Sequence, residues 1–189
     1  HEAIDILCKQ KCFVIKPSIN SYGGADIKFI RKGIKPTEAE LLIDKYRGNF
    51  IAQEIIIQHQ DTETFNQQSV NTIRILSLFL NGKVSVLKSV LRCGQNGAEV
   101  DNASSGGLMI NIKENGKLDE FGIDQRFRKI FETNNGIKIG EQQITGFSKL
   151  REMVINNHSK LYPTLRLVAW DFAINTLGDP IFIEGNTTI

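Results

Sequence analysis

Two carboxylates and a carboxamide stand close together near the end of the sequence. Asp171 is followed by Glu184, and Asn186 comes two residues later. Their side-chain oxygens are hard ligands that suit Mg²⁺, which keeps some waters and takes further ligands from a phosphate. The turn residues 178–180 predict that these side chains meet on neighbouring strands. The alternative interpretation is that Asp171 and Glu184 are solvated charges at strand ends.

The strand around Asp171 has two different faces by alternation. One face is bulky and predicts core packing, and it comprises Val168, Trp170, Phe172 and Ile174. The other carries Leu167, Ala169, Asp171 and Ala173, so small neighbours leave room for a ligand beside the carboxylate in a water-accessible cleft. Gly185, between Glu184 and Asn186, would allow a close approach of another group.

Lys16 is a second candidate for chemistry. It ends an apolar run and precedes Pro17 and a loop over residues 18–24, which includes Ser21, Gly23 and Gly24. A cationic side chain beside a glycine-bearing loop can bind phosphate through its charge and through backbone N–H groups. The GxxxxGK[ST] order is absent, so this is not a Walker A loop. The alternative is a surface hairpin with an exposed lysine.

The elements that must position these residues follow from periodicity and turn residues. Thr37 and Glu40 predict a capping box at the start of a helix, and Asn81-Gly82 predicts a tight hairpin. Helices are predicted over 38–46 and 147–161, and strands over 12–16, 26–30, 50–57, 70–80, 83–91, 108–112, 117–121, 166–175 and 181–184. Residues 94–107 read as a long polar loop, and residues 122–145 have no clear pattern. The order predicts an α+β fold with largely antiparallel sheets.

The composition restricts the classes of function. The 189 residues, 41% hydrophobic and 23% charged, are enough for one domain or two small lobes with a real core. The 23 basic and 21 acidic residues are scattered, and no apolar stretch is long enough for a bilayer. We therefore expect no nucleic-acid partner and no membrane span. Three cysteines without framework spacing predict reduced thiols in a cytoplasmic protein.

Several short motifs together resemble the ATP-grasp superfamily, in particular its sugar-transfer-associated group from polysaccharide loci. They occur in the family's order: Val14–Pro17 with the Ser/Gly loop, Gln53–Ile56, Ser69–Arg74, Leu91–Gly94, Val100–Asn102, Ala169–Asp171 and Ile183–Asn186. The most specific is an Asp followed by Glu-x-Asn. This resemblance implies that Asp171, Glu184 and Asn186 bind Mg²⁺ against the triphosphate of ATP.

The resemblance also implies two lobes with a nucleotide cleft between them. Residues 1–57 would be a partial small lobe with the Gly/Ser loop and a hinge strand, and residues 58–189 the large lobe with the Mg²⁺ site. In the small lobe the implied nucleotide-binding residues are Lys16, Ser21, Gly23, Gly24, Gln53, Glu54, Ile56 and Ile57. In the large lobe Arg74, Arg92 and Asn102 would line the transfer site. Asp61 is a weaker candidate for a ribose-binding acid.

The function implied by the resemblance is that of an ATP-dependent ligase. A small-molecule carboxylate would be activated as an acyl phosphate and attacked by an amine, in cell-surface polysaccharide or sugar-linked biosynthesis. The sequence leaves open a phosphotransferase, a non-catalytic binding module and an unrelated β-rich interaction domain. Family members carry a further lysine on an earlier strand, and nothing precedes His1 here. We therefore expect a fragment truncated at its N-terminus, inactive or weak in nucleotide binding by itself.

Overall fold

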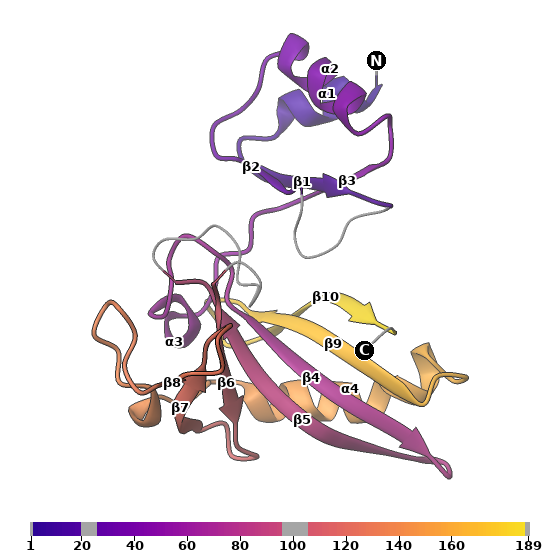
Figure 1. Ribbon diagram of the computed structural model, residues 1–189. Helices are drawn as coiled ribbons and strands as arrows, with labels where there is room; N and C mark the ends of the chain where they lie inside the picture. Colours follow the sequence, from indigo (N-terminus) through magenta and orange to yellow (C-terminus); the bar gives the residue numbers. More distant parts are fainter. Residues whose placement is uncertain (1, 20–25, 96–105, 188–189) are drawn as a thin grey trace. The chain divides into compact units, whose positions relative to one another are not determined.

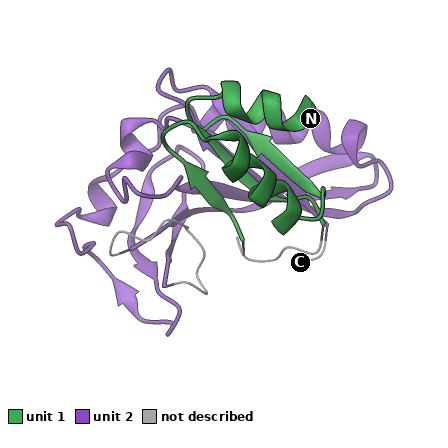
Figure 2. Ribbon diagram, turned by 90° about the horizontal axis from the view of Figure 1, so that it is seen from above, with its two compact units in different colours: residues 1–56 green, residues 57–189 purple. Residues whose placement is uncertain are grey.

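The computed structural model describes residues 2–19, 26–95 and 106–187. The chain divides into two compact units, His1–Ile56 and Ile57–Ile189 (Figure 2), each with its own hydrophobic core. Four residues predicted to bind ligands lie outside the described residues: Ser21, Gly23, Gly24 and Asn102. Most of the predicted loop over 94–107 lies outside them too.

The first unit is an antiparallel three-stranded sheet with two helices on one side (Figure 1). The strand order is β2-β1-β3, with β1 at Phe13–Pro17, β2 at Lys28–Ile30 and β3 at Phe50–Gln53; the helices are α1 (Glu2–Lys9) and α2 (Pro36–Lys45). Phe13 and Ile15 alternate along β1 and are buried in the core with Leu7 of α1 and Leu42 of α2. Lys16 therefore points to the opposite face of the sheet, away from that core.

Three local predictions in this unit were wrong or missing. The helix predicted from Glu38 begins at Pro36, and Lys35 rather than Thr37 is its N-cap, because the fixed φ and missing N–H of proline suit the first turn. The Glu38 side chain accepts a hydrogen bond from the Lys35 backbone N–H at 2.8 Å. The strand predicted over 50–57 ends at Gln53, and α1 was not predicted.

The second unit is an antiparallel seven-stranded sheet with α4 along one face (Figure 1). The strand order is β10-β9-β4-β5-β6-β7-β8. The elements are α3 (Gln60–Glu63), β4 (Thr72–Leu80), β5 (Lys83–Cys93), β6 (Leu108–Ile112), β7 (Leu118–Ile123), β8 (Lys129–Ile130), the 3₁₀ turn η2 (Ile139–Glu141), α4 (Phe147–Leu161), β9 (Leu167–Ile174) and β10 (Pro180–Asn186). The predicted α+β class with antiparallel sheets and flanking helices is thus confirmed.

The core of the second unit lies between this sheet and α4. Val168, Trp170, Phe172 and Ile174 are all buried in it, as alternation predicted. A buried polar chain also joins the helix to two strands: Trp170 Nε1–H donates to Ser77 Oγ at 2.8 Å, and Ser77 Oγ lies 2.7 Å from His158 Nδ1. His158 Nε2 lies 3.0 Å from the Leu165 carbonyl, so Nε2–H donates there and Nδ1 accepts from Ser77. These hydrogen bonds hold α4 against β4 and β9.

Cys8, Cys12 and Cys93 are all free thiols. Within the described ranges, no helix is long and apolar enough to cross a bilayer.

The start of α4 sits against the turn between β9 and β10. Gly146 has a φ of 75°, and a Cβ added to it would stand 2.2 Å from the Gly178 carbonyl oxygen. Gly146→Ala is expected to lower the free energy of unfolding by about 2–4 kcal/mol, because left-handed strain and a backbone clash add. Chemical denaturation measures the change. Gly136→Ala is the matched control. Gly136 also has a positive φ, of 81°, but the atom nearest to an added Cβ is the Glu132 side-chain oxygen at 4.0 Å. Equal losses in both variants would contradict the clash.

Asp124 organises the turn between β7 and β8. Its Oδ1 accepts from the backbone N–H groups of Arg126 and Arg128 at 2.9 Å each, and its Oδ2 accepts from Arg128 Nε at 2.7 Å. The Arg128 backbone N–H, followed by the Arg128 side chain and the Arg126 N–H, holds the pKa of Asp124 below its ordinary value of 3.8. A carboxyl group whose pKa is lowered by folding stabilises the fold at pH values above its ordinary pKa. This stabilisation is lost as the pH falls through the lowered pKa.

Asp124→Asn is therefore expected to be less stable than wild type near neutral pH. The difference should begin to shrink near pH 4, where the carboxyl of the unfolded chain takes up a proton, and should continue to shrink as pH falls through the lowered pKa of the folded state. Unfolding free energies across this range measure it. A constant gap between the two proteins would refute the link between charge and stability.

Candidate active site

One face of the seven-stranded sheet carries a row of charged side chains. Glu184 of β10 lies opposite Asp171 of β9, and Asp171 lies opposite Arg74 of β4. Two residues before Arg74 on β4, Thr72 lies opposite Arg92 of β5. Directly opposed residues share a face, as do residues two apart on one strand. These side chains therefore gather on the face opposite the one that packs on α4.

A β-bulge in β10 puts Glu184 on this face. Phe182 pairs with Phe172, while Glu184 pairs with the next residue of β9, Asp171, so the register shifts between Phe182 and Glu184. The Phe182 ring packs on Trp170 at 5.9 Å and on Phe172 at 5.7 Å between centroids, on the core side. Regular alternation would place Glu184 on the core side with Phe182. The extra residue at the bulge turns Glu184 to the polar face.

Gly185 is required by close packing on the opposite, core face. It pairs with Trp170, and a Cβ added to Gly185 would lie 2.2 Å from the Tyr162 hydroxyl. The Tyr162 ring packs edge-on against Trp170 at 5.3 Å. The expected close approach at Gly185 is therefore made by Tyr162, which leaves the neighbouring Glu184 and Asn186 on the polar face.

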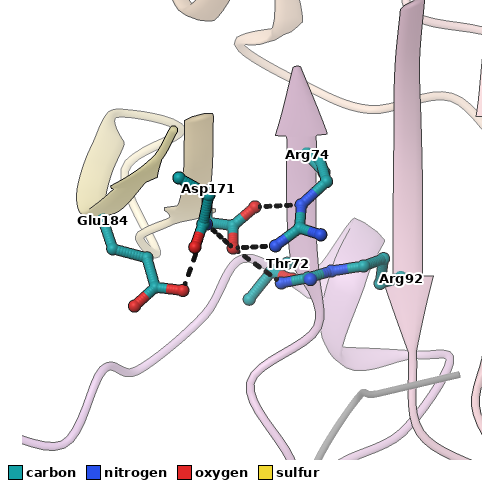
Figure 3. A network of polar contacts seen from close by, with 6 residues as sticks. Thr72, Arg74, Arg92, Asp171 and Glu184 are labelled. Atoms are coloured by element: carbon teal, nitrogen blue, oxygen red, sulfur yellow. Dashed lines mark hydrogen bonds and ion pairs between the residues drawn. The ribbon is translucent and has the colours of Figure 1, made fainter. Parts of the chain in front are cut away.

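Asp171 is the centre of the polar cluster (Figure 3). Arg74 binds it through both oxygens: Nε donates to Oδ1 at 2.8 Å and Nη2 donates to Oδ2 at 2.6 Å. Arg92 Nη2 donates to the same Oδ2 at 3.1 Å, and Asn186 Nδ2 donates to it at 3.2 Å. Asn186 Nδ2 also lies 3.3 Å from Glu184 Oε1. Asp171 therefore contacts Arg74, Arg92 and Asn186, and Asn186 links it to Glu184.

Burial differs strongly among the charged groups. The Asp171 side chain is 2% exposed, Arg92 is 12% exposed and Arg74 is 35% exposed, while Glu184 is on the surface. For Asp171, the predicted water-accessible position is wrong, and so is the alternative of a solvated strand-end charge, whereas Glu184 is exposed. A buried carboxylate needs compensating charge and hydrogen bonds, and here Arg74 and Arg92 provide both.

Arg92 is held by a residue that the sequence analysis missed. Thr72 Oγ1 accepts from Arg92 Nε at 2.9 Å and from Nη2 at 2.7 Å. Thr72 is buried and lies two residues before Arg74, on the same face of β4. The period of two along the strand was the signal that could have identified it.

The donor chemistry of the cluster fits a hard divalent cation. The carboxamide of Asn186 lies within hydrogen-bond distance of both Asp171 and Glu184, and rotation of that amide would present its oxygen to the same point. Two carboxylates and a carboxamide would then surround one position. No group of three His, Cys, Asp or Glu side chains suitable for a metal occurs in the described parts of the chain.

The predicted nucleotide-binding residues of the first unit fall on β1, β3 and the segment after it. Lys16 pairs with Ile51, and Gln53 pairs with Val14, so Lys16 and Gln53 share the face away from the helices. Glu54 and Ile56 follow the end of β3 without regular structure, which corrects the predicted hinge strand. Ile57, exposed, is the first residue of the second unit.

His59 and Asp61 have local structural contacts. The Nδ1 atom of His59 accepts from the Asp61 backbone N–H at 3.2 Å, which makes His59 the N-cap of α3. The Asp61 carboxylate accepts from the Thr145 backbone N–H at 2.8 Å, just before α4. These contacts tie α3 to the start of α4.

A cavity of about 450 Å³ lies elsewhere in the second unit. It is lined by Asp61, Glu114, Asn115 and residues 143–148 and includes none of the polar cluster. Four ionisable groups, Asp171, Glu184, Arg74 and Arg92, gather in the cluster, and the cavity holds no comparable set, so we assign the candidate site to the cluster.

The chain is similar to known proteins along its whole length. The family described as sugar-transfer associated ATP-grasp matches residues 1–189. None of the curated proteins compared with the chain matches it.

Solved structures share its fold. N5-carboxyaminoimidazole synthetase from Staphylococcus aureus, complexed with ADP, has a TM-score of 0.58 and 11% identity, over 100% of this chain and 37% of that one. L-amino acid ligase from Bacillus licheniformis has a TM-score of 0.53 and 13% identity, over 95% of this chain and 32% of that one. D-alanyl-alanine synthetase A from Vibrio cholerae has a TM-score of 0.51 and 12% identity, over 98% of this chain and 44% of that one. The chain thus spans less than half the length of each of these three proteins.

Proposed function

Because the chain belongs to the sugar-transfer-associated ATP-grasp family, we propose that the full-length protein is an ATP-dependent ligase that joins a carboxylate to an amine. The observation that carries this proposal is the cluster on the sheet, where Asp171, Glu184 and Asn186 meet Arg74 and Arg92. A non-catalytic binding module has no need for paired carboxylates beside two guanidinium groups. The three solved structures described above carry the names of synthetases and ligases, which agrees with this reaction class.

The residues of the cluster suit the transfer of a phosphoryl group. Asp171, Glu184 and Asn186 would hold Mg²⁺, which supplies neutralisation of the negative charge on the triphosphate. Arg74 and Arg92 would stabilise charge on the oxygens of the transferred group. A substrate carboxylate oxygen attacks the γ-phosphorus, the bond to ADP breaks, and an acyl phosphate forms. The amine then attacks the acyl carbon, phosphate leaves, and loss of a proton completes the amide.

The first unit is assigned to nucleotide binding in this proposal. We assign residues 1–57 to a small lobe and residues 58–189 to a large lobe. Lys16, with Ser21, Gly23 and Gly24, would bind phosphates, and the segment from Gln53 through Glu54 to Ile56 and Ile57 would meet the adenine. Asn102 would join Arg74 and Arg92 at the transfer site.

The proposed substrates are small molecules, and the family's association with sugar transfer supports a sugar-linked carboxylate or amine. Polysaccharide biosynthesis is the proposed place of this reaction. The dependence on ATP and the three free cysteines favour the cytoplasm as the place of reaction.

Thermal shift followed by product analysis tests the proposal. The full-length protein is expected to gain thermal stability with Mg²⁺ and a non-hydrolysable ATP analogue together. With candidate amino acids and amino sugars, it should release ADP and phosphate and form an amide. A phosphorylated acceptor would instead identify a phosphotransferase. Binding of the analogue without any turnover would identify a binding module, and the absence of binding would reject all three functions.

A further inference from the structure

Arg74 occupies the carboxylate that the proposed function requires as a metal ligand. Its guanidinium binds both oxygens of Asp171, at 2.8 Å and 2.6 Å, in the paired geometry that makes such contacts strong. Oδ2 also receives N–H groups from Arg92 and Asn186 within 3.2 Å. A Mg²⁺ ion binds oxygen at about 2.0–2.1 Å. In this arrangement, a cation bound to Oδ2 of Asp171 would share that oxygen with the guanidinium groups of Arg74 and Arg92.

Electrostatics opposes that sharing. Arg74 and Arg92 already place two positive charges against one carboxylate that is 2% exposed. Repulsion between a divalent cation and these charges is weakly screened at a buried position. Glu184 is the only other carboxylate that the described residues place in this cluster, and it lies at its exposed side.

The two arginines differ in how they are held. Arg92 is anchored to Thr72 by two hydrogen bonds and is 12% exposed. Arg74 is 35% exposed, and it makes the bidentate contact with Asp171. An incoming anion can therefore reach Arg74 from solvent more easily than it reaches Arg92.

We propose that Arg74 keeps divalent cations off Asp171 until the triphosphate of a nucleotide takes over the Arg74 guanidinium. Phosphate oxygens offer the same paired acceptors as a carboxylate, so the guanidinium exchanges one partner for another. Asp171 is then released to bind the cation, together with Glu184 and Asn186. Metal and nucleotide consequently bind cooperatively, and each raises the affinity for the other by the same factor. This inference rests on the proposed function, in which Arg74 contacts the phosphate oxygens once the nucleotide is bound.

Binding of Mn²⁺ without nucleotide tests the inference. Electron paramagnetic resonance of free Mn²⁺ measures the affinity of the full-length protein, with no need for catalysis. Arg74→Gln is expected to raise the Mn²⁺ affinity about tenfold or more over wild type, because one repelling charge and the bidentate contact are removed. Arg74→Lys should show a smaller gain in Mn²⁺ affinity, since lysine keeps the positive charge but lacks the paired N–H donors of the guanidinium. In the double variant Arg74→Gln with Asp171→Asn, the gain should disappear.

Arg128→Gln is the matched control. Arg128 also pairs with an aspartate, Asp124, at 2.7 Å, but at the turn between β7 and β8. Its loss should leave Mn²⁺ affinity unchanged. Melting curves show that each variant is folded, and Arg74→Lys carries the test if Arg74→Gln does not fold.

The outcomes separate the inference from the proposed function. If Arg74→Gln, or Arg74→Lys in its place, binds Mn²⁺ no better than wild type, the inference is overturned. If wild type nevertheless binds Mn²⁺ with a non-hydrolysable ATP analogue, the proposed metal and nucleotide site still stands. If no variant binds Mn²⁺ with or without the analogue, the inference and the proposed function both fail.

Discussion

Glu184→Gln is expected to reduce ATP turnover of the full-length protein by about a hundredfold to a thousandfold while leaving its Tm almost unchanged. A proposed ligand of the metal is lost, and metal stabilisation of transition-state charge is worth several kcal/mol. The folding energy should barely change, because the Glu184 side chain is exposed and its contact within the described residues is with Asn186 at 3.3 Å. Rates of ADP release and thermal melts measure both quantities.

Asp171→Asn should lower the stability of the fold, in contrast to Glu184→Gln. Turnover should fall to a similar extent, but the amide leaves Arg74 and Arg92 without their buried counter-charge. We expect a loss of about 1–3 kcal/mol in unfolding free energy, which Glu184→Gln should not show. Glu152→Gln, on the exposed side of α4, is the control and should change neither quantity. Wild-type turnover in both cluster variants would remove the metal site from the proposal.

Lys16→Ala is expected to weaken nucleotide affinity by about tenfold to a hundredfold. A charge-assisted contact with phosphate contributes roughly 1.5–3 kcal/mol. The melting temperature should change little, because Lys16 lies on the face of β1 opposite the buried Phe13 and Ile15. Calorimetric titration with an ATP analogue measures the affinity.

Lys28→Ala is the control for Lys16→Ala. Lys28 lies on the neighbouring strand β2, is exposed, and pairs with Ile15, so it belongs to the other face of the same sheet. It should bind the nucleotide like wild type. Equal affinities in all three proteins would show that Lys16 is an ordinary surface lysine.

Much of the second unit was predictable from local pattern. The helix over 147–161 has the predicted bounds, and Asn81-Gly82 forms the hairpin between β4 and β5. The core face of β9 follows strict alternation around Trp170. These features depend on neighbours along the chain, whose spacing is set by helix and strand geometry. The short α3 within a polar segment and the two-residue β8 have too few residues to show a period.

The candidate site was only partly predictable. The order Asp171, Glu184, Asn186 and the resemblance it carries could be read directly, and the structure joins these side chains by hydrogen bonds. The local pattern did not reveal that Asp171 is buried against Arg74, because the strand register that aligns them joins residues far apart in the sequence. Nor did it reveal the bulge before Glu184, without which alternation would place this carboxylate on the core side.

The amino-acid sequence by itself determined which face of β9 carries the bulky core side chains and which ligand types follow them, because the two-residue period is built into an extended backbone. Only the tertiary structure decided the partners of Asp171. Register and bulges are settled by the summed packing of β4, β9, β10 and α4, in which Tyr162 over Gly185 and Phe182 over Trp170 leave one alignment for Glu184.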